Sequence, residues 1–178
     1  INIQPGDILY DNNDAKLYFV CGFGDPLDTW DELNSSKKNN AVSIIVKLEY
    51  QGKSILFCGD AVGREDCQTT DDCIATEKYM VDNLPDELID SDVIIAPHHG
   101  ADNSSCDAFI SEVSPEYVVF SCGHRYRHPR YSTAKRYLDY GVELSNIFRT
   151  DRGDHEVRTG EECEIEWDYL RIQDHHDQ

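Results

Sequence analysis

The sequence has little positive charge, no long apolar run and no Cys-x-x-Cys pair. It contains 16 Lys and Arg against 35 Asp and Glu, a formal net charge of −19 over 178 residues. Such a surface repels phosphate backbones, so duplex nucleic acid is a disfavoured partner, although acidity also fits a high-salt habitat. The apolar stretches, such as those at 42–46 and 93–97, are far too short to cross a bilayer. These absences predict a soluble chain with no membrane partner.

The seven cysteines are an odd number, and their spacing does not fit a zinc ribbon. Most of them lie in apolar, strand-like segments, where a buried free thiol is the usual state. Cys67 and Cys73 differ, because the surrounding segment is polar and the two could close a small loop. Their disulfide state and the redox compartment are left open.

The order of apolar and polar segments predicts one α/β domain with helices on one face of a mixed sheet. A strand at 15–21 precedes a surface loop at 22–40, and 43–50 and 54–60 form a hairpin. Helices and strands then alternate. The expected helices are 74–83, 107–113 and 132–141, and the expected strands are 92–96, 117–122, 146–150, 155–159 and 164–172.

The ends of two predicted helices carry recognisable signals. Ser104 or Ser105 is expected to cap the helix at 107–113. Gly141 follows the helix at 132–141, in the position where a left-handed residue ends a helix.

Polar residues follow four of the predicted strands. Asp60, the pair His98 and His99, the segment 122–129 with His124 and His128, and Asp151 each come directly after an apolar run. Ligand-binding residues of α/β proteins collect at the carboxyl ends of strands, so these side chains are expected on one rim. Each motif alone is also typical of an ordinary polar turn. Four together favour a site.

Carboxylate and imidazole groups from separate strands are suitable ligands for zinc, manganese or iron. A carboxylate can bridge two metal ions, and such a pair can activate water for attack on phosphorus or carbonyl centres. The pattern therefore indicates metal-assisted hydrolysis.

Four segments, in this order, resemble the metallo-β-lactamase-fold hydrolases. They are NNAVSIIVKLEYQGKSILFCGDA, DVIIAPHHGADNSS, SPEYVVFSCGHRYRHP and FRTDRGD. The resemblance covers roughly residues 1–160 and is closest to the branch that includes the hydrolase domain of the ComEC/Rec2 competence proteins. The ordered set is fairly specific, whereas no single motif is.

The resemblance assigns roles to individual residues. It implies that Asp60 bridges two zinc ions and takes part in catalysis, and that one of His98 and His99, without indicating which, ligates the second ion. It implies that His128 orients substrate or stabilises negative charge, while His124 and Asp151 lie on the rim or behind the ligands.

The sequence departs from that family in one large respect. The His-x-His-x-Asp-His motif, which supplies most of the family's metal ligands, is absent from these 178 residues. Residues 1–170 therefore resemble the C-terminal half of a four-layer αββα sandwich, with 171–178 expected as a frayed tail. A half-sandwich leaves one sheet face open, and ~600 Å² of exposed apolar surface would forgo about 15 kcal/mol. We therefore expect a partner chain or segment carrying the N-terminal half, or a swapped dimer.

The main functional hypothesis is a dinuclear zinc hydrolase of phosphoester or phosphodiester bonds. The acidic surface of the chain favours a small or single-stranded substrate over a duplex. Two alternatives remain open: a non-catalytic interaction module or pseudoenzyme of the same fold, and a lactone or acyl hydrolase. The motifs concern metal binding and do not identify the substrate.

Overall fold

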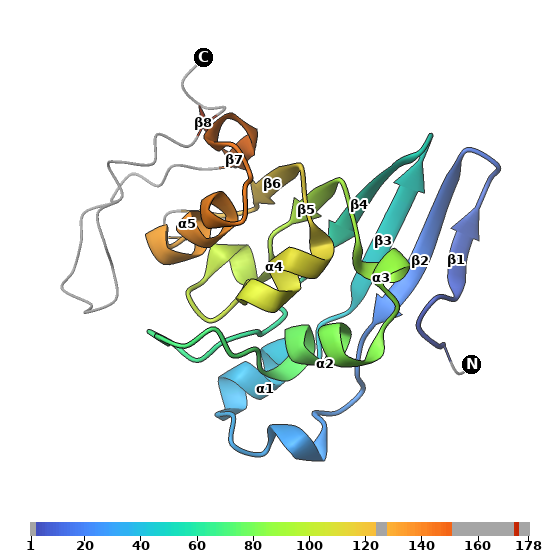
Figure 1. Cartoon of the computed structure of the whole chain (residues 1–178). Coiled ribbons are helices and arrows are strands. Elements are labelled where there is room, and N and C mark those ends of the chain that lie inside the picture. Colours follow the sequence, from blue (N-terminus) through green and yellow to red (C-terminus); the bar gives the residue numbers. More distant parts are fainter. Residues whose placement is uncertain (1–2, 124–127, 151–172, 175–178) are drawn as a thin grey trace.

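The computed structural model describes residues 3–123, 128–150 and 173–174, and they form an α/β structure built on a mixed sheet (Figure 1). The strands are β1 (Ile8–Asp11), β2 (Ala15–Cys21), β3 (Ile45–Tyr50), β4 (Lys53–Phe57), β5 (Val93–Ile95), β6 (Tyr117–Phe120), β7 (Ile147–Arg149) and β8 (Gln173–Asp174). The helices are α1 (Ser35–Ala41), α2 (Ala75–Asn83), α3 (Asp86–Ile89), α4 (Asp107–Val113) and α5 (Tyr131–Asp139). Three short 3₁₀ segments complete the set: η1 (Asp28–Trp30), η2 (Pro97–Gly100) and η3 (Leu144–Asn146).

The strands lie in the sheet in the same order as in the chain, from β1 to β8. β1 to β4 form an antiparallel meander, and β4 to β8 run parallel. The predicted hairpin joins β3 and β4 through Gln51 and Gly52, both with positive φ, as a two-residue turn of matching twist requires. The change from antiparallel to parallel pairing at β4 puts the carboxyl ends of β4, β5 and β6 at one edge.

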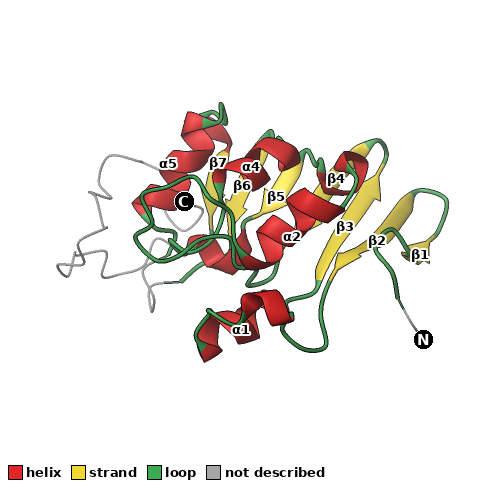
Figure 2. Cartoon of the chain, turned by 60° about the horizontal axis from the view of Figure 1, so that its bottom comes forward, coloured by secondary structure: helices red, strands yellow, loops and turns green. Residues whose placement is uncertain are grey.

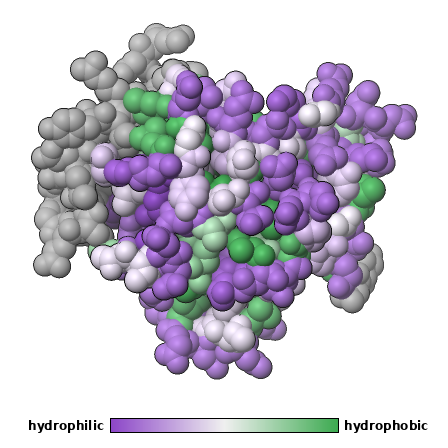
Figure 3. Space-filling model, in the orientation of Figure 1, coloured by the Kyte–Doolittle hydropathy of each residue, from purple (hydrophilic) through white to green (hydrophobic). Residues whose placement is uncertain are grey.

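The helices lie on one face of the sheet, as predicted (Figures 1 and 2). Alternate strand residues on that face are fully buried, among them Ile45, Leu56, Ile94, Val118 and Ile147. These residues pack in one core with apolar residues of α2, α3, α4 and α5. The outer side of this helical layer is mainly hydrophilic (Figure 3).

The opposite face of the sheet is apolar but only half-buried. Cross-strand register places its residues side by side, because paired residues on neighbouring strands share a face. We call this set the open face: Leu17, Phe19, Val46, Leu48, Ile55, Phe57, Val93, Ile95 and Val119. Phe57, at its centre, keeps 37% of its surface exposed. In the sandwich that the sequence predicts, the open face would be the side covered by the second sheet.

Several predicted elements appear within a few residues of their expected bounds, and others were missed. α1 lies in the segment expected to be a surface loop, and β1 was not predicted as a strand. Gly141 has φ +94° after α5, which confirms the predicted helix end. Gln173 and Asp174, in the expected tail, form β8, while the strands expected at 155–159 and 164–172 lie outside the described residues.

The structure resolves the disulfide state of Cys73, which the sequence left open: Cys73 is bonded to Cys106, 33 residues away in the chain, and does not close a small loop with Cys67. One sequence-based expectation was wrong. Neither Ser104 nor Ser105 caps α4, because the N-cap is Cys106 and a buried carboxylate from α2 accepts the backbone N–H groups there.

Within the described residues, no helix combines the length and the apolar character needed to cross a membrane.

Candidate functional site

The site lies at the carboxyl ends of β4, β5 and β6. Asp60 follows β4, His98 and His99 form part of η2 directly after β5, and Ser121 follows β6. Parallel pairing brings these three strand ends to the same edge of the sheet. The predicted convergence of Asp60 with the histidine pair is therefore present.

His99 and Asp60 face one another across the strand ends. The Nε2 atom of His99 lies 3.3 Å from Oδ1 of Asp60, and both side chains are nearly half exposed. On the other side of the ring, Nδ1 lies 2.5 Å from the carbonyl oxygen of Ser121. A carbonyl can only accept, so Nδ1 of His99 carries a proton. Nε2 faces the carboxylate oxygen of Asp60, a contact that either a second ring proton or a bound cation between the two atoms would satisfy.

His98 makes different contacts. Its Nδ1 lies 2.8 Å from Oδ1 of Asn103, and its Nε2 lies 3.1 Å from Nδ2 of Asn40. Both ring nitrogens are therefore engaged by amide side chains, and the ring is not directed at Asp60. Of the two histidines that the sequence could not separate, the one with a nitrogen facing Asp60 is His99.

His128 lies beside this pair. Its ring centroid is 6.0 Å from that of His98, and the peptide bond to Pro129 is cis. Burial lowers the pKa of His128 to about 3, with further lowering by the positive charge of Arg130 and by the two histidines. His128 is therefore a neutral imidazole at physiological pH. His124 and Asp151, the other predicted site residues, lie outside the described residues.

The backbone that carries the histidines is unusual. His98, His99 and Gly100 have φ values of 49°, 57° and 82°, so three successive residues are left-handed. A Cβ on Gly100 would lie 2.5 Å from Pro129 Cβ and 2.6 Å from Phe120 Cδ1, so only glycine fits. Non-glycine residues in this region are strained, and such strain concentrates at functional sites.

Surrounding elements hold the histidine loop, residues 97–106, in place. Ser104 Oγ donates to the carbonyls of Pro97 and Ala101 within the loop. From α5, the Arg136 guanidinium donates to the carbonyls of Asp102, Ser104 and Ser105. These bonds restrain the loop at both ends.

Glu77, on α2, anchors the end of the histidine loop. Its fully buried carboxylate accepts hydrogen bonds from the backbone N–H groups of Ser105 and Cys106, each 2.7 Å long. Burial raises its pKa to about 7, although these two bonds and the positive charges of Arg136 and Arg64 act in the opposite direction. Sequence reasoning missed Glu77, because nothing in its neighbourhood distinguishes it from a solvent-exposed helical glutamate.

Two of the predicted metal ligands, Asp60 and His99, face one another in the structure. Within the described residues, no cluster of three or more His, Cys, Asp or Glu side chains is arranged to hold a metal ion. Asp60 Oδ1 and His99 Nε2 supply one oxygen and one nitrogen, both of types that zinc accepts.

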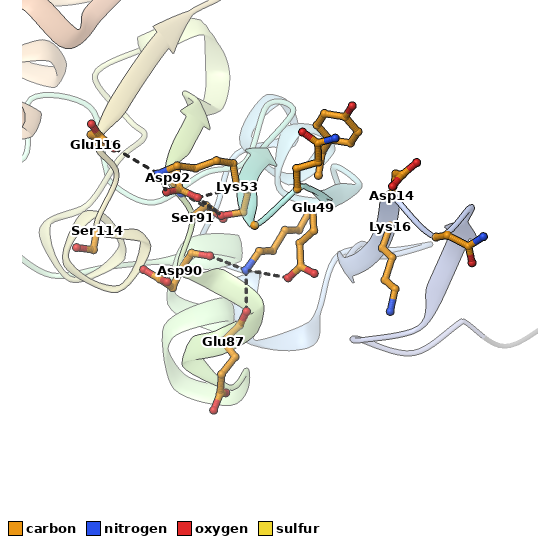
Figure 4. A pocket seen from close by; sticks show the side chains of 16 residues that line it. Asp14, Lys16, Glu49, Lys53, Glu87, Asp90, Ser91, Asp92, Ser114 and Glu116 are labelled. Atoms are coloured by element: carbon orange, nitrogen blue, oxygen red, sulfur yellow. Dashed lines mark hydrogen bonds and ion pairs between the residues drawn. The ribbon is translucent and has the colours of Figure 1, made fainter.

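A groove of about 810 Å³ lies at the opposite end of the sheet (Figure 4). The Nζ of the buried Lys47 donates to the carbonyls of Glu87 and Asp90, and Lys53 pairs with Asp92. The backbone carbonyls thus satisfy Lys47 and the Asp92 carboxylate satisfies Lys53, and the groove lies by the β3–β4 turn, away from Asp60 and His99. We interpret it as a structural network.

The fold and the site together define an α/β sheet with one helical layer and an aspartate–histidine pair at its strand ends. No family model matches the sequence. The chain is similar to the competence protein ComA of Neisseria gonorrhoeae, with 30% identity over 122 residues. The match includes 66% of this chain and 16% of that protein, so the chain spans a small part of the length of this relative.

Proposed function

We propose that this chain forms part of the metal site of a phosphoester hydrolase of the metallo-β-lactamase fold, with Asp60 and His99 as two ligands. The observation that carries this proposal is the distance of 3.3 Å between Nε2 of His99 and Oδ1 of Asp60. The Ser121 carbonyl fixes the tautomer of His99, which is the usual outer support of a metal-binding histidine. The similarity to ComA supports a setting within a competence protein.

Asp60 and His128 would have different roles in the proposed hydrolysis. Zinc, when bound, supplies Lewis acidity and makes water nucleophilic near neutral pH. Asp60 is held from behind by a bond from its backbone N–H to Ser43 Oγ, 3.1 Å long. His128, neutral because of its lowered pKa, can donate one N–H to an anionic phosphoryl oxygen without adding a charge.

We propose that a second sheet packs on the open face and supplies the remaining metal ligands. Zinc sites need about four ligands, and catalytic ones take about three from protein. A second sheet packed on Val46, Ile55, Phe57 and Ile95 would bury the half-exposed apolar surface and reach the same strand ends. We propose that this partner is the N-terminal half of the fold, carried by another chain or segment.

The disulfide bears on the compartment. Cys73 and Cys106 are bonded, and disulfides persist mainly in oxidising compartments. The proposed hydrolase would therefore act outside the cytosol.

Zinc titration of the chain, followed by calorimetry, tests the proposed ligands. We expect Asp60→Asn and His99→Ala each to weaken zinc binding at least ~10-fold, because each removes a direct donor. Asp14→Asn, at an exposed position by the groove at the opposite end of the sheet, makes the same change in charge as Asp60→Asn and should leave the affinity unaltered. Equal affinities in all four proteins would contradict the proposed site.

A comparison of substrates separates the alternatives. The protein completed with its N-terminal half is expected to hydrolyse a phosphodiester such as bis(p-nitrophenyl) phosphate and to lose that activity in Asp60→Asn. Hydrolysis of a lactone but no phosphodiester would favour the acyl hydrolase. Zinc binding with no hydrolysis of either would favour an interaction module.

Sedimentation of the isolated chain tests the open face. We expect self-association of the wild type, because exposed apolar sheet faces of this kind drive association. Phe57→Asp places a charge at the centre of the open face and should shift the chain towards monomer. Tyr140→Asp, at an exposed aromatic beyond α5, is the matched control and should not. If the wild type is instead a monodisperse monomer that unfolds cooperatively, the proposal that a partner covers the open face is wrong.

A further inference from the structure

His98 occupies a position where both of its ring nitrogens have defined partners. Asn103 presents a carbonyl oxygen to Nδ1, so Nδ1 must carry a proton. Asn40 presents an amide N–H to Nε2, so Nε2 must carry a lone pair. The two contacts therefore select the neutral Nδ1–H tautomer of His98.

Asn103 is itself firmly placed. Its side chain is buried, with 6% of the residue exposed, and its backbone carbonyl accepts hydrogen bonds from the N–H groups of Gly63 and Arg64. The oxygen that faces His98 therefore has little freedom to move away.

Asn40 belongs to a short segment, residues 40–43, that contacts both the histidine loop and the turn that carries Asp60. It belongs to the last turn of α1, and its carbonyl accepts from the backbone N–H groups of Val42 and Ser43. Ser43 in turn accepts from the backbone N–H of Asp60. The end of α1 thus contacts the histidine loop through Asn40 and the Asp60 turn through Ser43.

A direct bond also connects the two loops. The backbone N–H of His98 donates to the carbonyl of Gly59, 2.9 Å away, immediately before Asp60. A change in the placement of His98 is therefore transmitted to Asp60 on one side and to His99 on the other.

We propose that Asn40 is a positioning residue that, together with Asn103, fixes His98 as a non-ligating neutral imidazole and leaves His99 to face Asp60. This inference rests on the proposed function in one respect, because it takes Asp60 and His99 as the metal pair. The side chain of Asn40 contacts the ring of His98, and Asn40 acts through this contact.

The test is the tautomer of His98, read by long-range ¹⁵N–¹H correlation spectra of the histidine rings in the metal-free chain. We expect the wild type to show the Nδ1–H pattern for His98. In Asn40→Ala, the Nε2 lone pair loses its donor and the pattern should change to a mixture of tautomers. Asn39→Ala, one residue earlier and exposed, should keep the wild-type pattern. The spectra of the other histidines report whether each variant is folded.

Zinc titration gives the second readout. Asn40→Ala should weaken zinc binding by about tenfold, a typical effect of removing an outer support, and Asn39→Ala should not. His98→Ala should weaken zinc binding about as much as Asn40→Ala does, because both remove the same support, whereas His99→Ala should lose a direct ligand and weaken it further.

Two results would overturn the proposal: an Nε2–H pattern for His98 in the wild type, which needs no variant, or an unchanged pattern in Asn40→Ala. Absence of zinc binding in the wild type would instead refute the proposed function, and the tautomer result would still decide the role of Asn40.

Discussion

Gly63→Ala is expected to lower the free energy of unfolding by about 3–5 kcal/mol, the range for disrupting a buried charged network. A Cβ at this position would lie 1.8 Å from Oε2 and 2.1 Å from Cδ of Glu77. The carboxylate cannot move away without giving up its bonds to the N–H groups of Ser105 and Cys106. Those two N–H groups are buried, so water cannot replace the lost acceptor.

Urea unfolding measures this effect as a shift in the midpoint at constant slope. Gly24→Ala is the matched control, because a Cβ at Gly24 would meet nothing within 4 Å and its φ is not positive. We expect Gly24→Ala to change stability by less than ~0.5 kcal/mol. Equal midpoints for the two variants would show that Glu77 can relocate freely.

The same carboxylate predicts a dependence of stability on pH. Burial raises the pKa of Glu77 from 4.5 to about 7, so the folded chain keeps its proton where the unfolded chain has lost it. Between these values the unfolded state binds fewer protons, and stability therefore falls as pH rises towards 7 and then levels off. Glu77→Gln has no titrating group at this position, so its free energy of unfolding should lack this pH dependence. The difference in free energy of unfolding between the wild type and Glu77→Gln should therefore change by up to about 3 kcal/mol between pH 4.5 and about 7. A pH-independent difference would contradict the raised pKa.

Removal of the Cys73–Cys106 disulfide is expected to lower the free energy of unfolding by about 3–4 kcal/mol, because the bond closes a loop across a separation of 33 residues. The bond joins the segment just before α2 to the N-cap of α4 and so ends the histidine loop. Its loss should therefore also raise amide exchange through residues 97–106.

The test compares the double variant Cys73→Ala/Cys106→Ala with Cys58→Ala in urea unfolding. Cys58 is a fully buried free thiol, so its replacement reproduces the loss of a buried sulfur without breaking a covalent bond. The double variant should lose clearly more stability than the control. If both variants lose the same amount, the disulfide adds no stability beyond the packing of its sulfur atoms.

The sequence predicted the elements whose apolar residues follow a local pattern and also pack in the core. The helix at 107–113 appears as α4 with the same bounds, and the alternation of strands and helices after β4 is present. α1 was missed because its sequence, SSKKNNA, has no apolar period. Tertiary contacts stabilise it instead: Lys37 is buried and pairs with Glu65 and Asp66.

The candidate site was predictable in outline but not in detail. Strand ends indicated Asp60 and the histidine pair, because parallel strands bring their carboxyl ends to one edge. The sequence does not show which histidine faces Asp60, because the ring of His98 is engaged by Asn40 and Asn103, which lie 58 and 5 residues from it in the chain. No local pattern records a contact across 58 residues.

The sequential order of the strands bears on how the sheet assembles. Each strand from β2 onward pairs with the strand that precedes it in the chain, but the separation along the chain differs between pairs. β3 and β4 are joined by a two-residue turn, whereas the parallel pairs β4–β5 and β5–β6 are joined by crossover segments that contain helices. Local pairs form faster than pairs of distant segments, so the β3–β4 hairpin is expected to form before the parallel part of the sheet. During synthesis the sheet can grow one strand at a time from its N-terminal edge, before the last strands leave the ribosome.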